Sequence, residues 1–156
     1  MKKLSHLIVL LVVLTSCTSN SQSLTDLTPE QLNSEFFDLY KSKGNEASLK
    51  YIFSTNKWIS EGDITSVKTK LADLTSQLGK YYDKELITKK SIGKNYVLYS
   101  FLVKYERQPI RFTITYYKAD TKWQLQILEF DVDLQTELRE AASSYRLNEN
   151  LPGNEK

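Results

Sequence analysis

Apolar side chains recur with a helical period in the first half of the chain and with a period of two in the second half. A first helix is predicted to begin at Thr28, which can cap it, with Pro29 at the first helical position and Gln31 completing a capping box. Gly44-Asn45 should end this helix. The apolar positions between these bounds are Leu32, Phe36, Leu39 and Tyr40.

Two further helical segments are expected before the alternation begins. A second piece runs over residues 46–55, and Trp58 and Ile59 follow in a short extended stretch. Asp63 is predicted to cap a third helix that ends near Gly79. Its apolar residues form one stripe, which indicates a helix packed on a sheet: Ile64, Val67, Leu71, Leu74 and Leu78.

Four strands are predicted after this helix, over residues 81–90, 96–105 and 110–117 and from Trp123 onward. Short turns between consecutive strands favour an antiparallel meander. The last strand changes phase at the apolar pair Ile127-Leu128, which predicts a β-bulge.

The overall prediction is an α+β fold, with N-terminal helices packed on a curved antiparallel β-meander of about four strands and a C-terminal helix over residues 134–146. The stripe of this last helix is expected to lie over the second sheet face near Leu98 and Leu102. It consists of Leu134, Leu138, Ala141 and Tyr145.

The first residues are typical of a signal peptide and not of a folded element. Lys2 and Lys3 precede an apolar run over residues 7–14, which is too short to span a bilayer. The run leads into Leu14-Thr15-Ser16-Cys17, which resembles the lipobox of bacterial lipoproteins. The resemblance implies cleavage before Cys17 and attachment of acyl chains, such as palmitate, to this residue. An ordinary secretory signal followed by an unrelated cysteine is the alternative.

This interpretation divides the chain into four parts. Residues 1–16 are the lipoprotein signal peptide, 17–27 a flexible polar tether, 28–146 a single α+β domain and 147–156 a frayed tail. The expected location is the cell envelope, with the membrane as a partner through the lipid on Cys17. The outer membrane is favoured if the cell has two, because Thr18 carries no inner-membrane retention signal.

Removal of the signal peptide would limit the kinds of catalytic or metal-binding site that the remaining chain can form. The one histidine is His6, the one cysteine is Cys17, and removal of Lys2 and Lys3 leaves 19 basic against 19 acidic residues. Catalysis by Ser-His-Asp or Cys-His sites is therefore excluded, and a zinc site is disfavoured. A neutral domain is a poor nucleic-acid binder. No cofactor and no metal site is expected.

The order of helices followed by a meander is similar to the NTF2-like (cystatin-like cone) superfamily, and residues 122–125, Lys-Trp-Gln-Leu, leading into Phe130-Asp131, resemble the closing strand of small lipoprotein domains of that class. The resemblance implies a cone that encloses a pocket. Enzymes of the superfamily commonly use an Asp with a His or Tyr, and the missing histidine weakens an enzymatic interpretation.

The alternation places aromatic residues on the inner sheet face, where they are candidates to line a ligand pocket. They are Tyr99, Tyr105, Phe112, Tyr116 and Trp123. The alternative is that they form the core, with each hydroxyl reaching a partner.

Three charged groups are weaker candidates. Asp131 and Asp133 share one strand face and are interpreted as a solvated strand end, because the oxygen ligands that calcium needs are not supplied nearby. Glu129 is a possible inward carboxylate. Arg107 and Arg111 are interpreted as a surface ion cluster near Glu106.

We therefore expect a lipid-anchored accessory or binding module of the cell envelope, with a small apolar ligand or an envelope protein as partner. We expect it to be non-enzymatic, because the sequence shows no catalytic constellation. Two alternatives stay open. One is a small enzyme that uses carboxylate and tyrosine acid-base chemistry, and the other is a structural component that forms a homodimer through its sheet.

Overall fold

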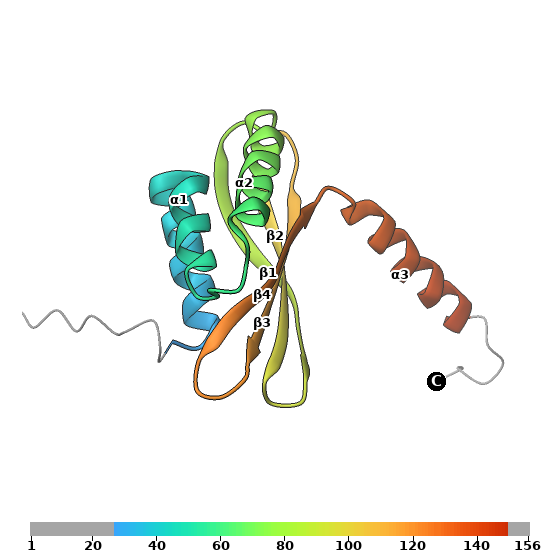
Figure 1. Cartoon of the computed structure of the whole chain (residues 1–156). Coiled ribbons are helices and arrows are strands. Elements are labelled where there is room, and N and C mark those ends of the chain that lie inside the picture. Colours follow the sequence, from blue (N-terminus) through green and yellow to red (C-terminus); the bar gives the residue numbers. More distant parts are fainter. Residues whose placement is uncertain (1–26, 150–156) are drawn as a thin grey trace, which may run out of the picture.

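The computed structural model describes residues 27–149, and side-chain surroundings up to Ser143. The predicted signal peptide, the lipobox and nearly all of the predicted tether lie outside this range. The elements in chain order are α1 (Pro29–Phe53), α2 (Glu61–Ser76), β1 (Tyr81–Ile92), β2 (Tyr96–Tyr105), β3 (Ile110–Lys118), β4 (Trp123–Asp131) and α3 (Leu134–Glu149). The predicted α+β class and element order are confirmed (Figure 1).

The first two predicted helical pieces form α1, which is kinked at Gly44. The capping box is present, since the Thr28 hydroxyl accepts from the Gln31 amide and the Gln31 side chain accepts from the Thr28 amide. Gly44 has a φ of 83°, a left-handed conformation that costs glycine little. The chain reverses there, and the second half of α1 runs back beside the first (Figure 1).

The start of α2 corrects one prediction. Ser60 caps the helix by accepting from the Asp63 amide, and Asp63 lies three residues inside and accepts from the Ser60 hydroxyl. Both residues are good caps, and the backbone turns helical after the first of them. Gly79, with a φ of 78°, follows the helix, and a Cβ there would lie 2.8 Å from a carboxylate oxygen of Glu106.

The sheet is an antiparallel meander in the order β1-β2-β3-β4. The bulge predicted in the last strand is present, because Thr115 pairs with Ile127 whereas Tyr116 pairs with Leu125. Ile127 consequently faces outward, and Leu125 and Leu128 face the helices. β1 extends to Ile92 and also carries two register shifts.

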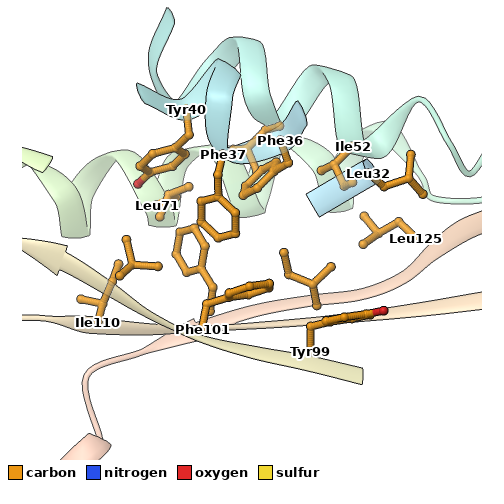
Figure 2. Close-up of a cluster of buried hydrophobic side chains, with 14 of the residues drawn as sticks. Leu32, Phe36, Phe37, Tyr40, Ile52, Leu71, Tyr99, Phe101, Ile110 and Leu125 are labelled. Carbon is orange, nitrogen blue, oxygen red and sulfur yellow. The ribbon is translucent and has the colours of Figure 1, made fainter. Parts of the chain in front are cut away.

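The core lies between the sheet and the two N-terminal helices. Figure 2 shows the aromatic side chains of α1 above those of β2, with Leu71 of α2 beside them. The ring of Phe37 stacks on Phe112, with centroids 6.0 Å apart, and meets Phe101 edge-on at 5.0 Å. Leu71 is the one fully buried residue of α2, and Ile64, Val67 and Leu74 of the same helix pack against the core partly buried.

The position of the last helix differs from the prediction. α3 leaves β4 and projects away from the sheet (Figure 1), and it ends at Glu149 instead of Arg146. Leu138 is 69% exposed, so the apolar stripe does not cover Leu98 and Leu102. The Tyr145 side chain lies outside the described part. Arg111 of β3 pairs with Asp131 of β4 and with Glu137 in the first turn of α3, so these ion pairs join the start of the helix to the sheet.

Candidate functional site

A cleft between the start of α1 and the β1–β2 edge gathers several polar groups against an apolar wall. The capping box fixes where α1 begins and therefore where Glu30 lies. In β1 the bulge after Leu86 brings Lys89 opposite Tyr99, on the inner face of the sheet. One helix start and two strands thus meet at this cleft.

Glu30 is the centre of a three-residue cluster in the cleft. One of its carboxylate oxygens, Oε1, accepts a hydrogen bond from Lys89 Nζ at 2.5 Å and another from the Tyr99 hydroxyl at 2.5 Å. Lys89 Nζ also lies 5.4 Å from the centroid of the Tyr99 ring. Lys89 and Tyr99 lie 59 and 69 positions after Glu30 in the chain, so the cluster ties the start of α1 to the sheet.

The cluster moves the pKa values of its acid and its phenol away from neutrality. Partial burial opposes ionisation of Glu30, but the hydrogen bonds from Lys89 and Tyr99 outweigh it and lower the pKa of Glu30 to about 2. Burial, together with the hydrogen bond to Glu30, raises the pKa of Tyr99 to about 12. At pH 7 the carboxylate is therefore ionised and the phenol protonated.

A hollow of about 190 Å³ lies on one side of this cluster. Asn33 lines it and is 4% exposed, and its amide Nδ2 has no hydrogen-bond partner among the described residues. A buried donor without a partner is costly and rare. The hollow is lined by Glu30, Asn33, Ser34, Lys84, Leu86, Tyr99 and Phe101.

These groups define which ligand chemistry the hollow suits. The Asn33 amide, the Ser34 hydroxyl and the Lys84 ammonium are donors, and Leu86 and Phe101 provide apolar surface. A small molecule with an apolar body and a hydrogen-bond acceptor matches this set. The volume lies below the range of drug-sized pockets, which begins at about 300 Å³, so the bound group is small or enters only in part.

A second hollow, of about 150 Å³, lies on the other side of the cluster and shares Glu30 and Tyr99 with the first. Its remaining lining is Pro29, Lys89, Ser91, Lys94, Val97 and Trp123. Glu30 and Tyr99 thus separate an apolar compartment from a lysine-rich one.

The structure divides the five aromatic residues that the sequence suggested as a pocket. Tyr99 and Trp123 line the hollows of the cleft. Phe112 and Tyr116 are fully buried beneath α1, and Tyr105 is nearly so. Both tyrosine hydroxyls have partners in the core, since Tyr116 donates to Asn33 Oδ1 at 2.8 Å and Tyr105 hydrogen-bonds to Tyr40. For these three residues the core interpretation fits.

The weaker charged candidates do not form a site. Asp131 is engaged in a bidentate pair with Arg111, at 3.0 and 3.1 Å, and is not a free strand end. Glu129 is exposed and lies opposite Thr113 on the outer face. Arg107 instead binds the Gln77 carbonyl, so it does not cluster with Arg111.

Glu30, Asn33 and Lys89 are the important residues that sequence reasoning missed. Asn33 carries a usable signal, because it is a polar residue inside the apolar stripe of a helix. Lys89 carries none, because strict alternation along β1 takes no account of the register shift after Leu86.

A third hollow, of about 490 Å³, lies between the end of α1 and the start of α2 and has a mostly charged and polar lining that includes Glu46, Lys50, Lys57 and Lys68. Within residues 27–149 there is no group of three or more potential metal ligands among His, Cys, Asp and Glu. Among the described helices, none is long and apolar enough to cross a membrane.

No family model matches the chain, and no curated protein matches it. Among solved structures, it is similar to a putative calcium/calmodulin-dependent protein kinase type II association domain from Thiobacillus denitrificans, with a TM-score of 0.45 and 12% identity over 66% of this chain and 93% of that one.

Proposed function

We propose that this protein is a lipid-anchored, non-enzymatic binding module of the bacterial cell envelope. Acyl chains on Cys17 would hold it to a membrane, the outer one if the cell has two. The domain would bind a small amphipathic molecule in the cleft between α1 and the β1–β2 edge. The NTF2-like resemblance agrees with a ligand-binding cone but is not needed for the proposal.

The observation that carries the proposal is an apolar hollow lined by Asn33, whose buried amide Nδ2 has no hydrogen-bond partner among the described residues. Leaving a buried donor unpaired costs about 1–3 kcal/mol, which a ligand with an acceptor would recover on binding. Leu86, at 55% exposure, keeps apolar surface in water at the same place. Both costs are relieved by one ligand of the chemistry described above.

Native mass spectrometry of the chain released from a membrane fraction in mild detergent tests the binding role. The wild-type domain should carry an adduct of small mass. Leu86→Ala removes apolar wall and Ser34→Phe fills the hollow, so both variants should lose the adduct. Ile87→Ala is the matched control, because Ile87 neighbours Leu86 and is likewise exposed but does not line the hollow. A bare wild-type domain, or an adduct kept by all variants, would contradict the proposal.

The anchor has a separate test. Cys17→Ala should abolish labelling by a radioactive fatty acid and release the chain from the membrane fraction. Two or more acyl chains hold a protein stably where one does not. Acylation that persists in Cys17→Ala would overturn this part of the proposal.

The enzymatic alternative fits the cleft less well. Glu30 and Tyr99 are within hydrogen-bond reach, as carboxylate-tyrosine chemistry requires. A carboxylate with a pKa of about 2 is a weak base, however, and a phenol with a pKa of about 12 is a weak acid at neutral pH. The Lys89 ion pair therefore favours a binding role for this cluster.

Self-association is a second candidate function, favoured by the uncovered outer face of the sheet. Tyr117 and Ile127 there are 38% and 39% exposed, and α3 lies away from them. The same mass spectra report the oligomeric state. A dimer that Ile127→Lys disrupts would favour this candidate, whereas a wild-type monomer at all concentrations would contradict it.

A further inference from the structure

The end of the sheet that carries the β1–β2 and β3–β4 turns is strongly basic. Residues 88–98 and 115–126 contain five lysines and a single acid, Asp120. These two segments are adjacent, because the Lys118 amide donates to the Asn95 carbonyl at 2.8 Å. We call this surface the basic end, and it consists of Lys89, Lys90, Lys94, Lys118 and Lys122.

The lysines of the basic end differ from other cations of the sheet in their partners. Lys104 is paired with Glu85 and Asp83, and Arg111 with Asp131 and Glu137. Within the described part of the chain, Lys89 is the one member of the basic end that forms a salt bridge. Lys90, Lys94 and Lys122 are exposed, so their charges face the solvent together.

The start of α1 lies at the same end of the domain. Pro29 and Glu30 line the second hollow together with Lys89, Lys94 and Trp123. Figure 1 shows the start of α1 on the side of the domain from which the β1–β2 and β3–β4 turns extend. Ten residues lie between Cys17 and Thr28, which makes eleven Cα–Cα steps. Even fully extended they reach at most about 40 Å, so a lipid on Cys17 would keep the basic end close to the membrane.

We propose that the basic end docks onto anionic lipid headgroups of the membrane that holds the anchor. This inference rests on the proposed lipid anchor. Ile92, 77% exposed beside the turn, would enter the headgroup layer as the apolar tip of the contact. Each lysine near an anionic surface contributes about 1 kcal/mol. The anchor supplies a high effective concentration, so a contact of this strength suffices.

Docking also sets the direction of the cleft. The second hollow opens among Lys89, Lys94 and Trp123, so it would lie at the membrane surface. The β2–β3 turn, which contains Glu106 and Arg107, lies at the opposite end of the antiparallel sheet and would point away from the membrane.

The full-length chain, purified in lipidated form and reconstituted into vesicles, gives the test. Because Cys17 is the one native cysteine and would be blocked by the proposed acylation, a single added cysteine takes an environment-sensitive fluorophore cleanly. Asn95→Cys reports on the basic end, and Gln108→Cys, in the turn at the opposite end, is the control. Vesicles contain phosphatidylcholine alone or with about a third phosphatidylglycerol, and brominated lipids serve as quenchers.

The label at position 95 should be quenched in the anionic vesicles, much less in neutral ones, and less again at about 1 M salt, where the Debye length is about 3 Å. The label at position 108 should stay unquenched throughout. Combined Lys90→Glu, Lys94→Glu and Lys122→Glu changes should lower the ratio of docked to undocked protein about 100-fold, since each lysine contributes about 5-fold.

The matched control makes the same charge change at the other end with Lys41→Glu, Lys43→Glu and Lys80→Glu, all at exposed positions, and should leave quenching at position 95 nearly unchanged. An acylated chain whose label at position 95 behaves as the label at 108 would overturn docking alone. An intact-mass measurement that finds Cys17 unacylated would overturn the anchor, and docking with it.

Discussion

The hydrogen bond between Tyr116 and Asn33 is predicted to be a measurable coupling at the floor of the cleft. Tyr116 is fully buried and Asn33 is 4% exposed, and their side chains are joined at 2.8 Å. Tyr116→Phe would leave both polar atoms of Asn33 without a partner in the domain. Leaving a buried polar group unsatisfied costs about 1–3 kcal/mol, so we expect a loss of about 2 kcal/mol in the free energy of unfolding.

A double-mutant cycle isolates this interaction. Asn33→Leu preserves volume and leaves the Tyr116 hydroxyl unpaired, but it also removes the buried Nδ2 donor that has no partner, so it should cost less than Tyr116→Phe. The double variant removes both polar groups, so it should be less destabilised than the sum of the single variants by about 1–2 kcal/mol. Tyr117→Phe makes the same chemical change at a partly exposed position and should alter stability by less than about 0.5 kcal/mol.

Urea unfolding followed by the fluorescence of Trp58 and Trp123 measures these differences. With a slope of about 1.5 kcal/mol/M, Tyr116→Phe should lower the urea midpoint by a little over 1 M. Single effects that add within about 0.4 kcal/mol in the double variant would refute the coupling, because residues that share no interaction behave in this way.

Three further predictions concern the same domain. The lowered pKa of Glu30, about 2, means that its pairing with Lys89 stabilises the fold above about pH 4.5 and is lost as the pH falls towards 2; because the Glu30 side chain is 54% exposed, the effect on unfolding should stay below about 1 kcal/mol and vanish in Glu30→Gln. Gly79→Ala should cost about 1 kcal/mol more than Gly44→Ala in urea unfolding, since both have positive φ but only the first places its Cβ against another side chain; equal costs would contradict this. Leu71→Ala should cost about 2–5 kcal/mol and shift the calorimetric midpoint accordingly, and a cost under about 1 kcal/mol would show that α2 is not held by this residue.

The features predicted correctly from sequence depend on residues close together in the chain. The capping box at Thr28 involves three neighbouring positions, and the bulge in β4 follows from the adjacent pair Ile127-Leu128. The cap of α2 was predicted at Asp63 instead of Ser60, because both residues cap well and the choice depends on backbone geometry. Such local uncertainty shifts a boundary but not the fold.

The cleft could be predicted only in part, because its residues meet through tertiary structure. Tyr99 and Trp123 followed from alternation. Glu30 and Lys89 meet only after α1 is laid on the sheet and the register shift in β1 has turned Lys89 inward. The stripe of α3 indicates that one face of the helix is apolar, but a stripe does not identify the surface on which that face packs.

The element order has a consequence for how the chain folds as it emerges from synthesis or export. Every strand pairs with its neighbour in sequence, so the sheet can form hairpin by hairpin with little loop-closure entropy, each on a scale of about 1–10 μs. α1 and α2 emerge first, yet the segment that follows α1 is tied to β4, because the Asn56 side chain donates to the Leu125 carbonyl 69 positions later. The aromatic face of α1 therefore has no sheet to cover it until most of the chain has appeared. During that interval we expect the nascent chain to be a client of holding chaperones.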